Sequence, residues 1–295
     1  MCGAGRVSAP SGLELYTRTA RQLSRRVIAA YSTSFGLASA MLPRRIRTGI
    51  ADVYALVRVA DEIVDGPAGE AGIDLEQVRD LLDDLERETL KAMGSGFSAN
   101  PVVHAFATTA RETGIDSRMV KPFFASMRMD VADGLRMDDV AYRLYIHGSA
   151  EVVGEMCLRV FIQERSDAVI DAELEEGARR LGAAFQKVNF LRDLADDAGR
   201  LRRVYIPGLD PEAFTDADKD AVADEIAEDL AVARVAIARL PPRSRRATAA
   251  AAMLFARLND QIRDMPAAQL RRTRASVPLP VKIGILVSAA TGQVA

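Results

Sequence analysis

Residues 186–207 read Gln186-Lys-Val-Asn-Phe-Leu-Arg-Asp-Leu-Ala-Asp-Asp-Ala-Gly-Arg-Leu-Arg-Arg-Val-Tyr-Ile-Pro207. Around the start of this stretch, apolar residues recur at helical spacing: Leu181, Ala184, Phe185, Val188, Leu191 and Ala195. The same helix carries a polar stripe, which at about 100° per residue falls within an arc of roughly 80°. The stripe consists of Gly182, Gln186, Asn189, Asp193 and Asp197. Because unpaired buried carboxylates are costly, a positive partner is expected, and Mg²⁺ prefers oxygen ligands of this kind.

A second helix is predicted over residues 50–65, and it is again rich in Ala, Val, Ile and Leu. One face carries Tyr54, Arg58, Asp61 and Asp65. Asp61 and Asp65 are four residues apart, so their carboxylates project from the same side. Two such helices that face each other across a cavity would hold a diphosphate between them through bridging Mg²⁺. The metal would neutralise the leaving group as a carbon–oxygen bond breaks.

A plainer interpretation is a solvated surface, because a single Asp-x-x-x-Asp pair on a helix is common. Here two pairs occur, each continued by uncharged polar or aromatic residues, and both lie on helices too apolar to be merely surface. The joint pattern therefore favours a metal and diphosphate site.

Three motifs resemble the squalene and phytoene synthase family. Residues 186–197 resemble its Gln-x-x-Asn-x-x-Arg-Asp-x-x-x-Asp signature, which continues through Arg203-Val-Tyr205-Ile-Pro207. Asp61-Glu-Ile-Val-Asp-Gly-Pro67 is most like the bacterial phytoene synthases, and Tyr31-Ser-Thr-Ser-Phe35 resembles the Ser-x-Ser-Phe entrance of the family. The similarity extends from about residue 15 to about residue 290. It implies the isoprenoid synthase fold, a single helical bundle around a central cavity.

The pattern of the chain independently predicts an all-α fold, because helical periodicity recurs and no run of alternating strands is present. We expect a disordered segment over residues 1–12 and one helical domain over residues 13–295. Glycines at positions 148, 154 and 182 lie within predicted helices, where glycine costs about 1 kcal/mol relative to alanine. Either tight packing between helices or the space left for an isoprenoid chain would compensate for this cost.

Composition narrows the class of protein. The 295 residues are 49% hydrophobic and carry a net charge of −2, so no polybasic attraction to nucleic acid is expected. Two cysteines, Cys2 and Cys157, form neither a disulfide framework nor a zinc-ligand pattern. We expect a cytoplasmic protein, because no signal peptide or apolar run of transmembrane length is visible.

The resemblance implies the head-to-head condensation of two geranylgeranyl diphosphates, through prephytoene diphosphate, to phytoene, a step in carotenoid biosynthesis. Mg²⁺ (or Mn²⁺) would be held by Asp61, Asp65, Asn189, Asp193 and Asp197, and no NADPH is expected. The other residues implied at the catalytic and substrate-binding site are Tyr31, Ser32, Thr33, Ser34, Phe35, Tyr54, Arg58, Tyr145, Gly154, Gln186, Arg192, Arg203, Tyr205 and Arg272.

Two alternatives remain open. One is a sister enzyme that takes farnesyl diphosphate to presqualene diphosphate, dehydrosqualene or squalene, and the other is a non-catalytic helical scaffold. Phe255 stands where the family often has a tyrosine, so a hydroxyl is missing there and altered efficiency is expected. The basic and apolar C-terminus is a candidate for peripheral contact at the inner face of a membrane.

Overall fold

The computed structural model describes residues 10–291 except residues 133, 198 and 200–201. Within these residues the chain folds into helices, with a single isolated bridge between Arg136 and Val204. The all-α prediction is therefore confirmed. The longer helices are α1 (Gly12–Tyr31), α2 (Thr33–Ala40), α3 (Arg44–Val64), α5 (Leu75–Ser95), α6 (Pro101–Thr113), α7 (Ser117–Met129), α8 (Asp139–Ile146), α9 (Val152–Phe161), α10 (Ala172–Arg192), α12 (Asp216–Arg239), α13 (Pro242–Asp264) and α15 (Leu279–Thr291).

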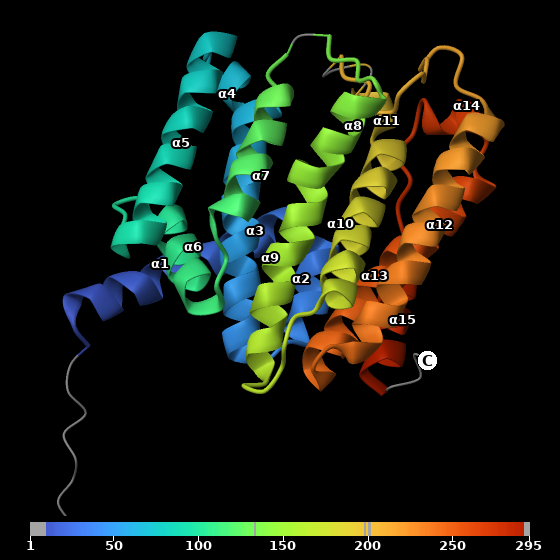
Figure 1. Ribbon diagram of the computed structural model, residues 1–295. Coiled ribbons are helices and arrows are strands. Elements are labelled where there is room, and N and C mark those ends of the chain that lie inside the picture. Colours follow the sequence, from blue (N-terminus) through green and yellow to red (C-terminus); the bar gives the residue numbers. More distant parts are fainter. Residues whose placement is uncertain (1–9, 133, 198, 200–201, 292–295) are drawn as a thin grey trace, which may run out of the picture.

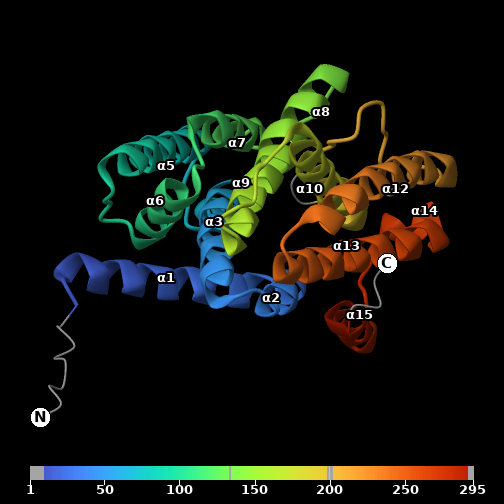
Figure 2. The ribbon, with the colours of Figure 1, turned by 60° about the horizontal axis from the view of Figure 1, so that its bottom comes forward.

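Helices α3, α9 and α10 run through the middle of the bundle (Figure 1). Helices α5, α6 and α7 flank them on one side, and α12 and α13 flank them on the other. Helices α1, α2 and α15 lie along one face (Figure 2), where α2 packs against both α1 and α15. None of the helices within the described residues is both long enough and apolar enough to cross a membrane.

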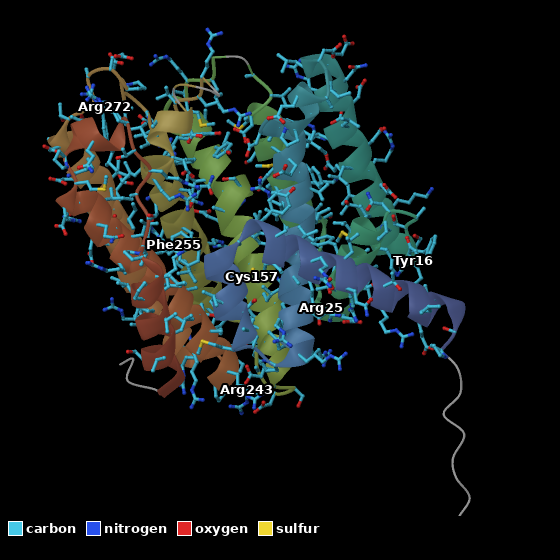
Figure 3. The ribbon with its side chains drawn as sticks, turned by 180° about the vertical axis from the view of Figure 1, so that it is seen from behind. Tyr16, Arg25, Cys157, Arg243, Phe255 and Arg272 are labelled. Carbon is cyan, nitrogen blue, oxygen red and sulfur yellow. The ribbon has the colours of Figure 1, made fainter. Side chains whose placement is uncertain are left out.

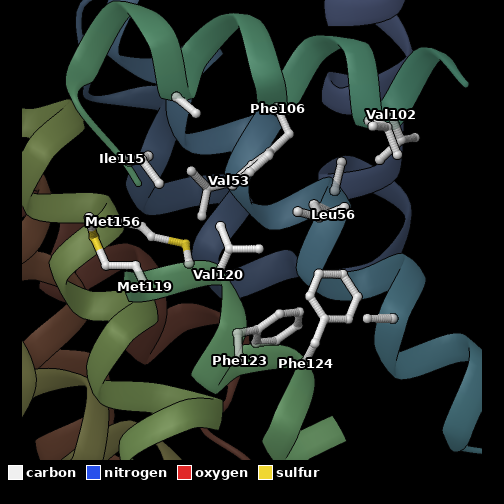
Figure 4. Packing of buried hydrophobic residues seen from close by; sticks show 14 of the residues in the cluster. Val53, Leu56, Val102, Phe106, Ile115, Met119, Val120, Phe123, Phe124 and Met156 are labelled. Carbon is white, nitrogen blue, oxygen red and sulfur yellow. The ribbon is translucent and has the colours of Figure 1, made fainter. Parts of the chain in front are cut away.

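Two large apolar clusters hold the bundle together. In the first, Leu56 of α3 packs near Phe106 of α6 and Phe124 of α7, all nearly inaccessible to solvent (Figure 4). The second joins α10, α12 and α13 through residues such as Leu191, Ile226 and Ile262. Because burial of apolar area supplies most of the favourable free energy of folding, these clusters fix the helices on either side of the middle layer.

Some predicted elements differ in detail. The predicted helix over residues 139–161 is interrupted by a π-helical turn, η1 (His147–Glu151), between α8 and α9. The predicted loop after Gly66 contains the short helix α4 (Pro67–Glu70). The sequence predicts a loop and then a helix over residues 209–229, and another helix over residues 230–240. In the structure α12 (Asp216–Arg239) is one continuous helix, which begins after the capping box at Thr215. The disorder predicted for residues 1–12 stays a prediction, since residues 1–9 lie outside the described part of the chain, although α1 already begins at Gly12.

Glycines bring the middle helices into close contact. A Cβ atom on Gly182 of α10 would lie 2.3 Å from the carbonyl oxygen of Ala150, and one on Gly154 of α9 would lie 2.2 Å from that of Ala178. A Cβ on Gly148 would lie 2.1 Å from the carbonyl oxygen of Pro122. These backbone atoms cannot move aside cheaply. Tight packing is therefore what compensates for glycine in these helices, although Gly154 and Gly182 also line the central cavity.

We predict that Gly182→Ala destabilises the protein, because the added methyl group must push α10 away from η1. Overpacking of this kind costs about 1–3 kcal/mol, which exceeds the gain in helix propensity. Urea unfolding followed by circular dichroism measures the change. Gly94→Ala in α5 is the matched control, since a Cβ at this position would meet nothing within 4 Å, and it should be neutral or slightly stabilising. Unchanged stability of Gly182→Ala would contradict the packing interpretation.

Candidate active site

One cavity of about 420 Å³ lies between the middle helices and those that flank them. Its polar end is lined by Asp61 and Asp65 at the end of α3 and by Asp193 and Asp197, which follow α10. Its apolar part is lined by residues such as Leu42, Phe161 and Ala251. The two acidic pairs, which lie far apart in the sequence, therefore share one cavity, as the polar faces of their helices predicted.

Both acidic pairs lie at the carboxyl ends of long helices. Asp61 is in the last turn of α3 and Asp65 follows its final residue, while Asp193 follows the final residue of α10. The carboxyl end of a helix carries a partial negative charge from its unpaired carbonyl groups. The carboxylates and the two helix ends therefore add up to a strongly negative pole in this part of the cavity.

Arginines meet this negative pole. Arg203, which is 5% exposed, donates to Oδ1 of Asp65 at 2.7 Å and to the carbonyl oxygen of Val64 at 2.6 Å. Arg192 and Arg274 both donate to Asp193, with Nε of Arg274 at 2.6 Å from Oδ1. Arg58 forms an ion pair with Glu62, and its guanidinium carbon lies 4.4 Å from the centre of the Tyr31 ring.

The pKa values of the aspartates differ because their surroundings differ. Burial raises the pKa of Asp61 well above its usual value, and the neighbouring carboxylate of Asp65 raises it further. Burial likewise raises the pKa of Asp197 to about 7, with added repulsion from Asp193 and Asp65. Burial also opposes ionisation of Asp193, but its hydrogen bonds and charge interactions with Arg192 and Arg274 outweigh it and lower the pKa. The arginines thus balance the negative charge of Asp193, but the charges of Asp61 and Asp197 are only partly balanced.

The polar end suits a divalent cation in one specific respect. The side-chain oxygen Oδ1 of Asn189 is buried without a hydrogen-bond partner, and Asn189 lines the cavity with the four aspartates. Within the described residues, no three His, Cys, Asp or Glu side chains are gathered closely enough to form a metal cluster. The acidic groups form pairs on two helices, and Mg²⁺ characteristically uses one or two carboxylates together with phosphate oxygens and water. The donor set therefore fits a metal that arrives with a diphosphate.

An aromatic wall completes the polar end. The rings of Phe190 and Tyr205 are stacked with centroids 4.4 Å apart, and the Tyr145 ring lies 4.9 Å from that of Tyr205. Asp130, which follows α7, accepts hydrogen bonds from both tyrosine hydroxyls. All four residues line the cavity. Phe190 and Asp130 were not among the residues predicted for the site, although Phe190 directly follows Asn189 in the signature.

The structure places most of the predicted site residues on this cavity. Gln186 and Tyr54 line it, and Ser32 hydrogen-bonds with Tyr54. Tyr31 lies at the surface, 51% exposed, beneath the guanidinium of Arg58. The side chains predicted for this entrance at Thr33, Ser34 and Phe35 lie outside the part of the chain that the structure describes.

Arg272 is located differently from the prediction. It is exposed at the outer edge of the molecule (Figure 3) and does not line the cavity. The reason is local: the backbone N–H of Arg272 bonds to the carbonyl of Gln269 and continues the turn of α14 (Ala267–Leu270). Arg274, two residues later, is the arginine that reaches Asp193.

Phe255 lies behind the cavity wall. Its ring stacks on that of Phe185, with centroids 3.8 Å apart, and Phe185 in turn lines the cavity. A phenylalanine at this position therefore packs well without a hydroxyl group.

Comparisons with known proteins identify relatives of this chain. The family model of squalene/phytoene synthase matches residues 28–280. A 15-cis-phytoene synthase from Paracoccus sp. (strain N81106 / MBIC 01143) is 33% identical over 274 residues, covering 86% of each chain. A presqualene diphosphate synthase from Rhodopseudomonas palustris is 29% identical over 67% of each chain.

Solved structures show the same fold. A dehydrosqualene synthase crystallised with a ligand superposes with a TM-score of 0.76 at 21% identity, over 95% of this chain and 99% of the other. A squalene synthase from Alicyclobacillus acidocaldarius gives a TM-score of 0.71 at 22% identity, over 87% of this chain and 96% of the other. The chain thus has the isoprenoid synthase fold. Since the family model covers most of the sequence, the chain belongs to the squalene/phytoene synthase family of prenyltransferases.

Proposed function

We propose that this protein condenses two molecules of geranylgeranyl diphosphate head to head, through prephytoene diphosphate, to phytoene. The observation that carries the proposal is the division of one cavity into a polar end with four aspartates and a long apolar part. A prenyl diphosphate has the same division between its head group and its hydrocarbon chain. The similarity to a 15-cis-phytoene synthase supports the C20 substrate.

Several residues that line the cavity or contact its aspartates would act in this mechanism. Mg²⁺ (or Mn²⁺), held by Asp61, Asp65, Asn189, Asp193 and Asp197, would neutralise the departing diphosphate. Arg58, Arg192 and Arg203 add fixed positive charge close to where negative charge develops on the leaving group. Breaking of the first carbon–oxygen bond leaves an allylic cation, and the double bond of the second molecule attacks it with loss of a proton to give the cyclopropyl intermediate.

In the second half of the reaction, the cavity wall must stabilise a carbocation. The intermediate loses its diphosphate, rearranges, and loses a proton to form the central double bond of phytoene. The faces of Tyr145, Phe190 and Tyr205 are electron-rich and attract a cation. The released diphosphate can take the last proton. No step in this sequence requires a reductant, so NADPH is not needed.

A second candidate uses the C15 substrate farnesyl diphosphate. It is favoured by the similarity to a presqualene diphosphate synthase, although the phytoene synthase relative is more similar and covers more of the chain. A scaffold without activity is disfavoured, because both acidic pairs are intact and share one cavity.

The substrate can be identified directly. Purified protein is incubated with Mg²⁺ and either geranylgeranyl or farnesyl diphosphate, with and without NADPH, and the extracted hydrocarbons are analysed by mass spectrometry. We expect a C40 product from geranylgeranyl diphosphate that does not depend on NADPH. A C30 product alone would select the sister reaction, and the absence of any hydrocarbon or cyclopropyl diphosphate would contradict the family activity for this chain.

Removal of one acidic group from either helix should stop the reaction. We predict that Asp61→Ala and Asp193→Ala each abolish product formation while the protein stays folded, because each removes a ligand from the negative pole and neither residue belongs to the apolar clusters. Asp84→Ala is a matched control on the exposed face of α5, where Asp84 pairs with Arg87. Product formation by either cavity variant at the wild-type rate would exclude the proposed mechanism.

We also propose that α15 contacts the surface of a membrane. Leu279, Ile283 and Val287 form an exposed stripe one helical turn apart, between 50% and 60% exposed. Helix α15 packs on α2 and α13, which line the apolar part of the cavity through residues such as Ala38 and Ala251. The exposed basic segment 271–272 precedes this helix in the sequence but lies near α14, at the opposite end of the bundle (Figures 1 and 3), so the apolar stripe carries the contact. A hydrocarbon product would leave on this side.

Flotation with vesicles that contain anionic lipid tests this contact. We predict that the double variant Leu279→Ser, Ile283→Ser floats less than the wild type, because it removes apolar area that would enter the interface. Val140→Ser with Leu144→Ser is the matched control, since these exposed residues lie on α8 at the other end of the bundle. Point variants are preferable to truncation after Arg274, which would also remove the buried residues Ala275 and Val277. Equal flotation of both double variants would contradict docking through α15.

A further inference from the structure

Asp130 occupies an unusual position for a carboxylate. It follows the last residue of α7, is 5% exposed, and lines the cavity. Each of its two oxygens accepts one phenolic hydrogen bond, from Tyr145 Oη at 2.7 Å and from Tyr205 Oη at 2.8 Å. The end of α7, helix α8 and the segment after α10 therefore meet at a single carboxylate.

The direction of these hydrogen bonds follows from chemistry. An ionised carboxylate can only accept, and each phenol has one proton to donate. Both phenolic protons therefore point to Asp130, and the tyrosine oxygens present lone pairs to their other neighbours. For Tyr205 one such neighbour is Nη1 of Arg203 at 3.4 Å, and the same nitrogen donates to Oδ1 of Asp65 at 2.7 Å. A continuous polar chain thus runs from Asp130 to the first acidic pair.

We propose that Asp130 is a positioning residue, which holds Tyr145 and Tyr205 so that electron-rich rings and oxygens face the cation formed in the cavity. This inference rests on the proposed function and deepens it. Asp130 acts through the two tyrosines, whose hydroxyls it binds. An orienting carboxylate of this kind is pre-organised, so no rearrangement is needed when positive charge develops on the substrate.

The surroundings indicate that the ionised carboxylate of Asp130 does not add to the stability of the fold. Burial raises its pKa to about 6, although Arg203 and the two tyrosine hydroxyls oppose the shift. A carboxylate in this setting costs free energy of folding when it is ionised. Other residues could end α7 at a lower cost, because the last turn of a helix disfavours negative charge.

Asp130→Asn tests the proposal with little change of shape. The amide keeps one acceptor oxygen, so one tyrosine hydroxyl must turn or lose its partner. We expect kcat to fall by about tenfold to a hundredfold, the range typical for loss of a residue that orients a functional group. The KM for the prenyl diphosphate should stay near the wild-type value, because Asp130 does not hold the head group.

Asp52→Asn is the matched control. Asp52 is fully buried in α3, accepts a hydrogen bond from Thr109 at 2.7 Å, and does not line the cavity. Both variants replace a buried carboxylate by an amide, so thermal unfolding of both shows the effect on stability alone. We expect kcat to be retained in the Asp52 variant. A kcat for Asp130→Asn equal to that of the wild type would overturn the proposal, as would a loss matched by a lower folded fraction.

A double-mutant cycle separates positioning from a merely structural role. If Asp130 acts through the tyrosines, then Asp130→Asn should cost far less in a Tyr145→Phe, Tyr205→Phe background than in the wild type. Full additivity of the two losses in kcat would overturn the proposal. The product assay on the wild type distinguishes failure of this inference from failure of the proposed function. If the wild type is active and Asp130→Asn is unaffected, only this inference is refuted. If the wild type is inactive, the proposed function and this inference are both refuted.

Discussion

Repulsion between negative charges at one end of the cavity is the constraint on which the rest of the site depends. Asp61, Asp65, Asp193 and Asp197 are brought together at the carboxyl ends of α3 and α10, where the helix dipoles add to the negative potential. Arg203 and Arg274 meet this charge from segments that follow α10 and α14. The chain after α10 therefore returns to the end of α3, where Arg203 contacts Asp65 and the carbonyl oxygen of Val64.

Much of this arrangement was predictable, because it depends on helical spacing. Asp61 and Asp65 are four residues apart at the end of an apolar helix, and Asp193 and Asp197 are four residues apart just after another. The spacing predicted that the two members of each pair lie on one side, although α10 ends at Arg192 and does not continue through Asp197. The polar stripe with Gln186 and Asn189 indicated which side of the helix faces the site, and both residues line the cavity. What spacing could not show is which groups pair with which, and therefore that Arg203 holds Asp65 while Arg192 and Arg274 hold Asp193.

The residues that sequence reasoning missed depend on contacts between distant segments. Asp130 lies at the end of a helix, outside any periodic pattern, and its role becomes visible only when Tyr145 and Tyr205 reach it from other elements. The sequence also did not show that Arg274 contacts Asp193 whereas Arg272 is exposed. In an irregular segment the direction of a side chain depends on the preceding turn, which here continues α14 through Gln269. The spacing of residues in the sequence does not reveal that direction.

The same positions control both the stability of the bundle and the shape of the site. Gly154 and Gly182 allow α9 and η1 to approach the backbone of α10 closely, and both glycines line the cavity. Asn189 lies on α10 and Asp193 directly follows its last residue, so the distance of both from the facing wall is set by these contacts. A larger residue at either glycine would separate these helices and would displace Asn189 and Asp193 from the side of the cavity that α9 and η1 form. Close packing of the glycines is therefore a requirement of the chemistry as well as of the fold, because groups that stabilise a developing charge act only when they are held at the correct distance.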